Sequence, residues 1–71
     1  MKIHDIGLFI AKRRKSLLVK QRDLAKLCGV SEHALCNLER GMGNPTLKLV
    51  CSAADALGLE LKLGAKDMEA T

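Results

Sequence analysis

Two short segments with helical apolar spacing, joined by the dipeptide Gly29-Val30, constrain this chain more than any other feature of its sequence. The first segment begins near Gln21, and the second follows Ser31. Their apolar positions are Leu24, Ala25, Leu27 and Cys28 in the first and Leu35 and Leu38 in the second. Glycine readily adopts the left-handed backbone that ends a helix, and serine is a favoured N-cap. The small Ala25 allows close packing, so we expect two helices at a steep angle, with the second standing out from the domain.

Two further helices are predicted on either side of this pair. The amino-terminal helix has the apolar residues Ile6, Phe9, Ile10 and Leu17, and the last helix has Leu47, Val50, Cys51, Ala54 and Leu57. The turn residues Gly43-Asn44-Pro45 separate the third helix from the fourth, and Thr46 is a suitable N-cap. The pattern predicts an all-α, four-helix domain within residues 1–64.

The apolar period changes from 3.6 to 2 after Gly58, because Leu59, Leu61 and Leu63 alternate with Glu60 and Lys62. This alternation predicts a short strand near residues 59–63. A lone strand has unpaired amides and carbonyls, so we expect it to pair with the same strand of a second molecule across a two-fold axis. A frayed extension, or a continuation of the fourth helix, is the alternative. Residues 65–71 are expected to be a disordered tail.

The small size of the chain also favours a dimer. A domain of 71 residues buries only about 60% of the surface of its unfolded chain, so it usually needs a further source of stability. The three cysteines, Cys28, Cys36 and Cys51, cannot all pair within one chain, and they lack the spacing of a zinc site. We expect them to be buried, reduced thiols that act as small apolar residues, as in a cytoplasmic protein. No metal and no cofactor is predicted.

The net charge of +4 is concentrated at the amino-terminal end. Its cations are Lys2, Lys12, Arg13, Arg14, Lys15, Lys20 and Arg22. Such a cluster favours a polyanion, either nucleic acid or an anionic membrane, although a solvated helix face is an alternative. No apolar segment approaches a membrane span and no secretory leader is expected. Modules that read single strands stack bases on aromatic rings, and Phe9 is the only aromatic residue, so double-stranded DNA is favoured.

The segment from Gln21 to Gly41 resembles the phage repressor and Cro class of helix-turn-helix proteins, the XRE family. The shared pattern is Gln-x-x-Leu-Ala-x-x-x-Gly-Val-Ser-x-x-x-Leu-x-x-x-Glu-x-Gly, and the resemblance extends from Ile6 to about Leu57. The ending Ala56-Leu-Gly-Leu-Glu-Leu-Lys-Leu63 is similar to that of HipB-like antitoxins. The first resemblance implies a lambda-repressor-like four-helix domain. The second implies a short terminal strand that pairs between the subunits of a dimer, and a HipA-like kinase toxin as partner.

The resemblance to the XRE family also implies roles for individual residues. Arg14 and Glu39 correspond to a salt bridge between the first helix and the end of the recognition helix. The groove-facing positions, expected to read bases, are Glu32, His33, Ala34 and Asn37. Glutamate can accept a hydrogen bond from cytosine, asparagine can read adenine, and alanine can contact a thymine methyl group.

Phosphate contacts are expected from Gln21, Ser31, Arg40, Asn44, Thr46 and Lys20, and such contacts position a protein on DNA without reading its sequence. Two residues depart from the family pattern. Lys20 stands where an N-cap residue is usual, and Leu18 stands where glycine is common. Either Leu18 adopts a left-handed conformation, or the connection between the first two helices has another shape.

No pair of carboxylates and no nucleophile–base arrangement points to an enzyme. The predicted function is a sequence-specific transcriptional regulator that binds a palindromic operator as a homodimer. It would repress its own operon as a HipB-like antitoxin. The alternatives are a stand-alone phage-type repressor and a protein-interaction module that no longer binds DNA.

Overall fold

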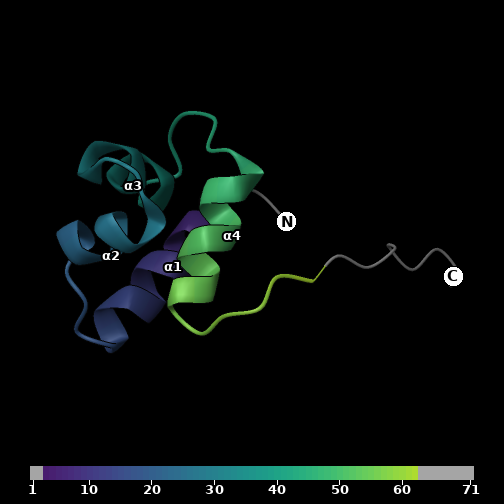
Figure 1. The fold of residues 1–71 in the computed structure, drawn as a ribbon. Helices are drawn as coiled ribbons and strands as arrows, with labels where there is room; N and C mark the ends of the chain where they lie inside the picture. Colours follow the sequence, from purple (N-terminus) through teal and green to yellow (C-terminus); the bar gives the residue numbers. More distant parts are fainter. Residues whose placement is uncertain (1–2, 63–71) are drawn as a thin grey trace, which may run out of the picture.

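The computed structural model describes residues 3–62, which form four α-helices and no strand. The helices are α1 (Ile3–Ser16), α2 (Gln21–Cys28), α3 (Glu32–Glu39) and α4 (Leu47–Ala56). In Figure 1, α2 and α3 lie together on one side of the molecule, α4 lies on the other, and α1 runs behind them. The predicted all-α fold with four helices is therefore confirmed.

The core lies where the four helices meet. Its buried apolar residues are Ile10, Leu24, Ala25, Leu35, Leu38, Leu49, Val50, Ala53 and Leu57. Leu24, Leu35 and Leu38 are the largest fully buried side chains, and they come from α2 and α3. Burying each of these leucines stabilises the fold by about 1.5–3 kcal/mol. The helix-turn-helix is therefore anchored to the rest of the domain by its own inner face.

The corner between α2 and α3 has the predicted geometry. Gly29 follows α2 in the left-handed conformation, with φ 70°, and its amide donates to the last turn of α2. Val30 packs against the core beside it. The Ser31 hydroxyl then accepts a hydrogen bond from the Ala34 amide at 3.0 Å, which caps α3. This cap satisfies one of the free amides at the start of the helix.

The contact between α1 and α3 depends on Gly7, which the sequence analysis did not single out. Gly7 is buried, and a β-carbon at this position would collide with the carbonyl oxygen of Leu38. Glycine is the only residue without that carbon, so it allows the two helix backbones to touch. The distance between α1 and α3 is set by this contact.

In the connection between α1 and α2, Leu18 adopts the left-handed conformation, the first of the two alternatives given above. Leu18 has φ 59°, and its side chain is 91% exposed. Lys20 occupies the N-cap position of α2 with extended backbone angles, and its side chain makes no capping hydrogen bond. Leu18 therefore has a strained backbone, and α2 lacks a side-chain cap. Both effects are local, and the helices α1 and α2 still form.

Several apolar residues that were expected to face inward lie at the surface, which corrects the sequence analysis. The exposed large side chains among them are Phe9, Leu17, Leu27 and Leu47. Within the helices, successive residues are rotated by about 100°, so a short helix buries only one narrow stripe. Leu27, for example, is 72% exposed, although it lies only three residues after the buried Leu24.

The expectation of three buried cysteines was wrong. Cys51 is exposed, and Cys28 and Cys36 are half-buried. Cys51 follows the buried Leu49 and Val50 on α4 and is rotated away from their stripe. The position of Cys51 around the helix therefore decides its exposure, and its apolar character does not.

The chain continues beyond α4 without secondary structure from Leu59 to Lys62. The predicted strand is therefore not present in the single chain, which offers it no second strand among the described residues. Leu63 of that strand, Lys2 and the predicted tail of residues 65–71 lie outside the described part. No helix within residues 3–62 is long and apolar enough to cross a membrane.

Candidate nucleic-acid interface

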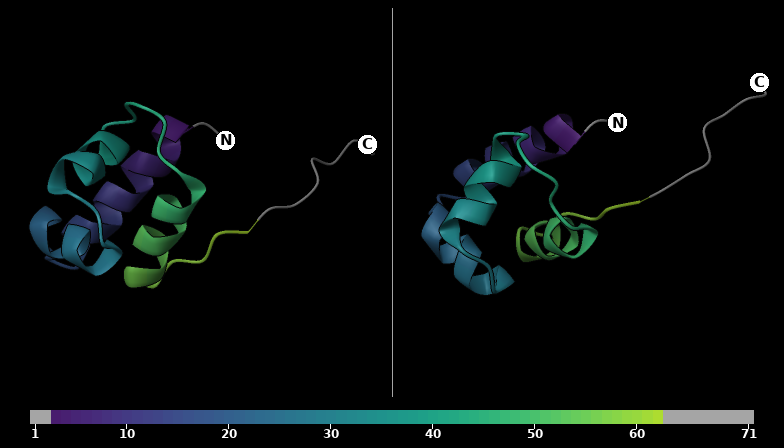
Figure 2. Two further views of the ribbon diagram at one scale, coloured as in Figure 1. Left: turned by 45° about the horizontal axis from the view of Figure 1, so that its top comes forward. Right: turned by 90° about the horizontal axis from the view of Figure 1, so that it is seen from above.

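The helix α3 presents one side to the core and the other to solvent. Leu35, Leu38 and Glu39 are buried, whereas Glu32 and His33 are exposed. In both Figure 1 and Figure 2, α3 lies between α2 and the loop that leads to α4. The predicted base-reading residues at the start of α3 are therefore accessible.

His33 and Asn37 are neighbours on the outer side of α3, one helical turn apart. The Asn37 Nδ2 atom lies 3.4 Å from His33 Nε2 in an exposed contact. Ala34, the fourth predicted base reader, and Asn37 itself are half-buried. An imidazole and an amide offer both donors and acceptors, which is the chemistry that base edges in a major groove require.

Behind α3, three helices are joined by a buried polar network. Arg14 of α1 makes a two-pronged ion pair with Glu39 of α3, with Nε 2.7 Å from Oε2 and Nη2 2.9 Å from Oε1. The remaining nitrogen, Nη1, donates to the Val19 carbonyl at 2.8 Å. Arg14 is 8% exposed and Glu39 6%, so the pair is shielded from water. The hydrogen bonds that Arg14 donates to the Glu39 carboxylate raise the pKa of Arg14 and keep it charged.

Gln21 is the third member of this network, a role that the sequence analysis missed. Its Nε2 atom donates to Glu39 Oε1 at 2.9 Å. Gln21 is the first residue of α2 and is half-buried. Because a glutamine amide has two hydrogens and an acceptor oxygen, this bond still leaves a donor for a ligand. The network therefore connects the start of α2 to the end of α3 through a single carboxylate.

Residues 10–63, most of the chain, match the family model described as helix-turn-helix, of the HTH_3 type. The chain belongs to the XRE-type helix-turn-helix family. A comparison with curated proteins gives no match. Membership in this family makes the protein a DNA-binding transcription regulator rather than a member of an enzyme family.

Two of the predicted phosphate contacts of this XRE-type protein serve as helix caps. Ser31 caps α3, and the Thr46 hydroxyl accepts a hydrogen bond from the Leu49 amide at 3.1 Å to cap α4. Of the four other predicted contacts, Gln21 is half-buried, and Lys20, Arg40 and Asn44 are exposed. The amide-rich ends of α3 and α4 remain positive ends of helix dipoles, which favour an approaching anion.

The basic cluster of α1 is divided between structure and surface. Arg14 is buried in the ion pair, and Arg13 is half-buried, with its Nε donating to the Leu57 carbonyl at 3.0 Å. Lys12 and Lys15 are exposed. Part of the charge that suggested a polyanion partner therefore holds α1 to α3 and to the end of α4.

One residue on the outer side of α3 was misassigned to the core. Cys36 is half-buried and follows His33 by three residues and precedes Arg40 by four, so helical spacing places it on their side. The same spacing, applied to His33 and Asn37, would have identified it from the sequence. Its thiol therefore belongs to the outer side of α3.

The described residues contain no group of three histidine, cysteine or acidic side chains that could hold a metal ion. The site therefore consists of polar side chains on α3, a positioned glutamine at the start of α2, and exposed cations. This arrangement can contact base edges and phosphates.

Proposed function

We propose that the protein is a sequence-specific repressor that places α3 in the major groove of double-stranded DNA. The observation that supports this most directly is the orientation of α3. Its inner residues are fixed in the core, while Glu32 and His33 are exposed and Asn37 contacts His33 at the surface. A recognition helix must present its polar side in this way.

The base contacts are assigned to Glu32, His33, Ala34 and Asn37. Asn37 would read an adenine through both groups of its amide, and Glu32 would accept a hydrogen bond from cytosine. The contact between Asn37 and His33 favours a joint role, because it aligns two hydrogen-bonding side chains along the helix. Ala34 is small enough to approach a thymine methyl group.

The phosphate contacts are assigned to residues at both ends of the helix-turn-helix. They are Gln21, Lys20, Ser31, Arg40, Asn44 and Thr46. Gln21 is held by Glu39, so its free amide hydrogen is already oriented when DNA arrives. Such contacts fix the register of the protein on the duplex.

The active form is proposed to be a homodimer on a palindromic operator. Residues 59–63 of the two subunits would pair as two antiparallel strands at the dimer interface. Their apolar residues are Leu59, Leu61 and Leu63. Two recognition helices on one side of DNA require a separation of about 34 Å, which is one helical turn. The operator should therefore consist of two inverted half-sites with that spacing.

The ending of the sequence supports an antitoxin role in the cytoplasm, with a HipA-like kinase toxin as partner. Coexpression of the chain with the product of a neighbouring reading frame tests this. A stoichiometric complex whose second component phosphorylates protein when released would support the antitoxin role. A chain that shuts off its own promoter without any such partner would be a stand-alone repressor.

Selection of bound duplexes from a random DNA library tests the DNA-binding function. We expect an inverted repeat to be enriched, with an affinity that falls steeply with salt, because phosphate contacts release counterions. Gln21→Ala should weaken binding to all sequences alike. Asn37→Ala should relax the preference at one base pair of each half-site by about 1–3 kcal/mol.

Failure of the selection has a clear meaning. A folded protein that enriches no sequence, and whose weak binding does not respond to salt, would be a protein-interaction module. If Asn37→Ala reduced binding to every sequence equally, the assignment of Asn37 to base reading would be wrong.

A further inference from the structure

The segment after α4, residues 59–62, runs without secondary structure, and residues 3–62 provide no strand to pair with it. Leu59 packs against the core, and its amide donates to the Ala54 carbonyl at 2.8 Å. Within the described residues, the backbone groups of Glu60, Leu61 and Lys62 make no hydrogen bond to the protein backbone. Such a row of open donors and acceptors is suited to pairing with another strand.

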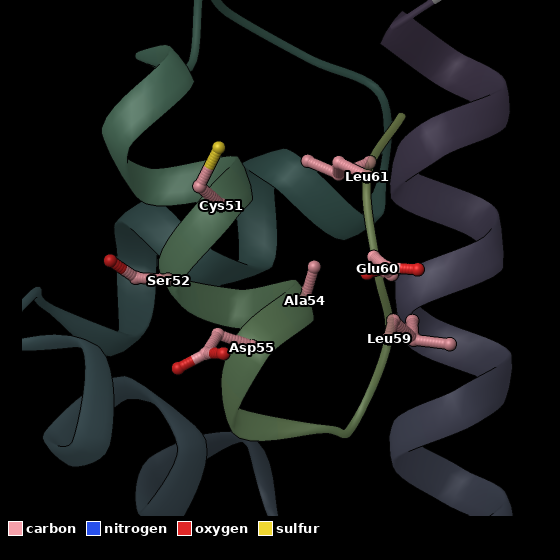
Figure 3. A pocket seen from close by; sticks show the side chains of 7 residues that line it. All are labelled: Cys51, Ser52, Ala54, Asp55, Leu59, Glu60 and Leu61. Atoms are coloured by element: carbon pink, nitrogen blue, oxygen red, sulfur yellow. The ribbon is translucent and has the colours of Figure 1, made fainter. Parts of the chain in front are cut away.

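This segment is bordered by two grooves. The groove in Figure 3 lies between the segment and α4, and it is lined by Cys51, Ser52, Ala54, Asp55, Leu59, Glu60 and Leu61. The second groove opens toward α1, and its lining is mostly apolar, with Ile6, Phe9, Ile10, Ala54, Leu59 and Leu61. Phe9 is 63% exposed there, a large apolar surface for so small a domain.

Resting on the homodimer proposed above, we propose a specific register for its shared strand. The two copies pair antiparallel about an axis through Leu61, so that Glu60 lies opposite Lys62 of the partner subunit. Leu61 then faces the partner's Leu61. The second copy thereby covers the groove beside Phe9.

The charges and leucines of the segment exclude the neighbouring registers. An axis through Glu60 or through Lys62 would place like charges directly opposite each other, which is destabilising. An axis that passes between two residues would place leucines opposite charged side chains. Leucines and charged side chains would then lie on the same face of the two-stranded sheet. Only an axis through Leu61 places leucine opposite leucine and, twice, Glu60 opposite Lys62 of the partner subunit.

The side chains of Glu60 and Lys62 are available for this pairing. In the single chain they lie 3.4 Å apart, with 78% and 80% of their surfaces exposed. An ion pair so exposed contributes little, so it is readily exchanged for contacts across the dimer. Substitutions at these two positions also leave the core of each subunit intact.

A charge reversal experiment tests the register. We expect Glu60→Lys and Lys62→Glu each to weaken the dimer about tenfold, because each creates two pairs of like charges across the axis. The combined variant E60K/K62E should dimerise like the parent. A mixture of the two single variants should form heterodimers in preference to either homodimer, since opposite charges then meet at both positions.

Analytical ultracentrifugation and native mass spectrometry of the parent, the variants and the mixture provide the readout, with circular dichroism as the control for folding. If both single variants dimerise like the parent and mix statistically, the register is wrong while the dimer stands. If the parent is monomeric at high concentration, the proposed homodimer itself fails. DNA selection, measured separately, decides the proposed DNA-binding function.

Discussion

Gly7 of α1 contacts the carbonyl oxygen of Leu38 in α3 so closely that no β-carbon fits between the two helices. We therefore expect Gly7→Ala to destabilise the protein by about 1–3 kcal/mol, as an overpacked core does. On an open helix surface the same substitution stabilises by up to about 1 kcal/mol. Urea unfolding at fixed protein concentration measures the sign, and a stabilised variant would contradict this contact.

The shared carboxylate of Glu39 is expected to be the most sensitive polar group of the fold. Glu39→Ala leaves Arg14 charged and buried and removes the partner of Gln21, at a cost on the order of 3–5 kcal/mol. If this variant does not fold, Glu39→Gln provides a milder version of the same loss. The double variant Arg14→Met/Glu39→Leu removes both charges together.

Denaturant unfolding of Arg14→Met, Glu39→Leu and the double variant forms a cycle for this ion pair. We expect the double variant to lose less stability than the sum of the two single losses, because no lone charge remains buried. Additive losses would mean that Arg14 and Glu39 act independently, which their 2.7 Å contact argues against.

Leu18 gives an opportunity to stabilise the protein. Its left-handed backbone, with φ 59°, costs a non-glycine residue roughly 1–2 kcal/mol, and its exposed side chain offers little burial in return. Leu18→Gly should raise the free energy of unfolding by about 0.5–1 kcal/mol after the entropy of glycine is subtracted. The neighbouring Leu17→Gly is the control, and thermal denaturation should show it to be less stable than the parent.

The missing cap of α2 is a second such position. Lys20→Ser should add a hydrogen bond to a free amide of the first turn and stabilise the protein by about 1 kcal/mol. Ser31→Ala removes the equivalent cap of α3 and should cost a similar amount. Thermal denaturation of the free protein compares them, and equal midpoints for both variants would contradict the role of these caps.

The three thiols are expected to differ in reactivity. Burial raises the pKa of Cys28, so at a given pH it holds less thiolate, while Cys51 is exposed. In variants that retain one cysteine each, Cys51 should react faster with iodoacetamide than Cys28, as followed by mass spectrometry. Because this pKa is raised on folding, the protein loses stability as the pH rises from the unfolded pKa of Cys28 towards the higher folded value.

The local signals in the sequence predicted the order of the helices and the corner between α2 and α3. Gly29 and Ser31 act through their own backbone and side chain within a few residues, so their roles are visible without the fold. The exposed start of α3, with Glu32 and His33, could likewise be predicted from spacing and family pattern.

The tertiary structure decided which residues meet across the domain. Gly7 matters because Leu38 lies against it, and Gln21 has an unexpected partner in Glu39. It also decided that Leu27 and Cys51 face solvent, although both fit a helical apolar pattern. Short-range periodicity determines which helices can form, but one short helix allows several inner faces. Only packing against the other three helices selects among them, because that choice depends on contacts between residues distant in sequence.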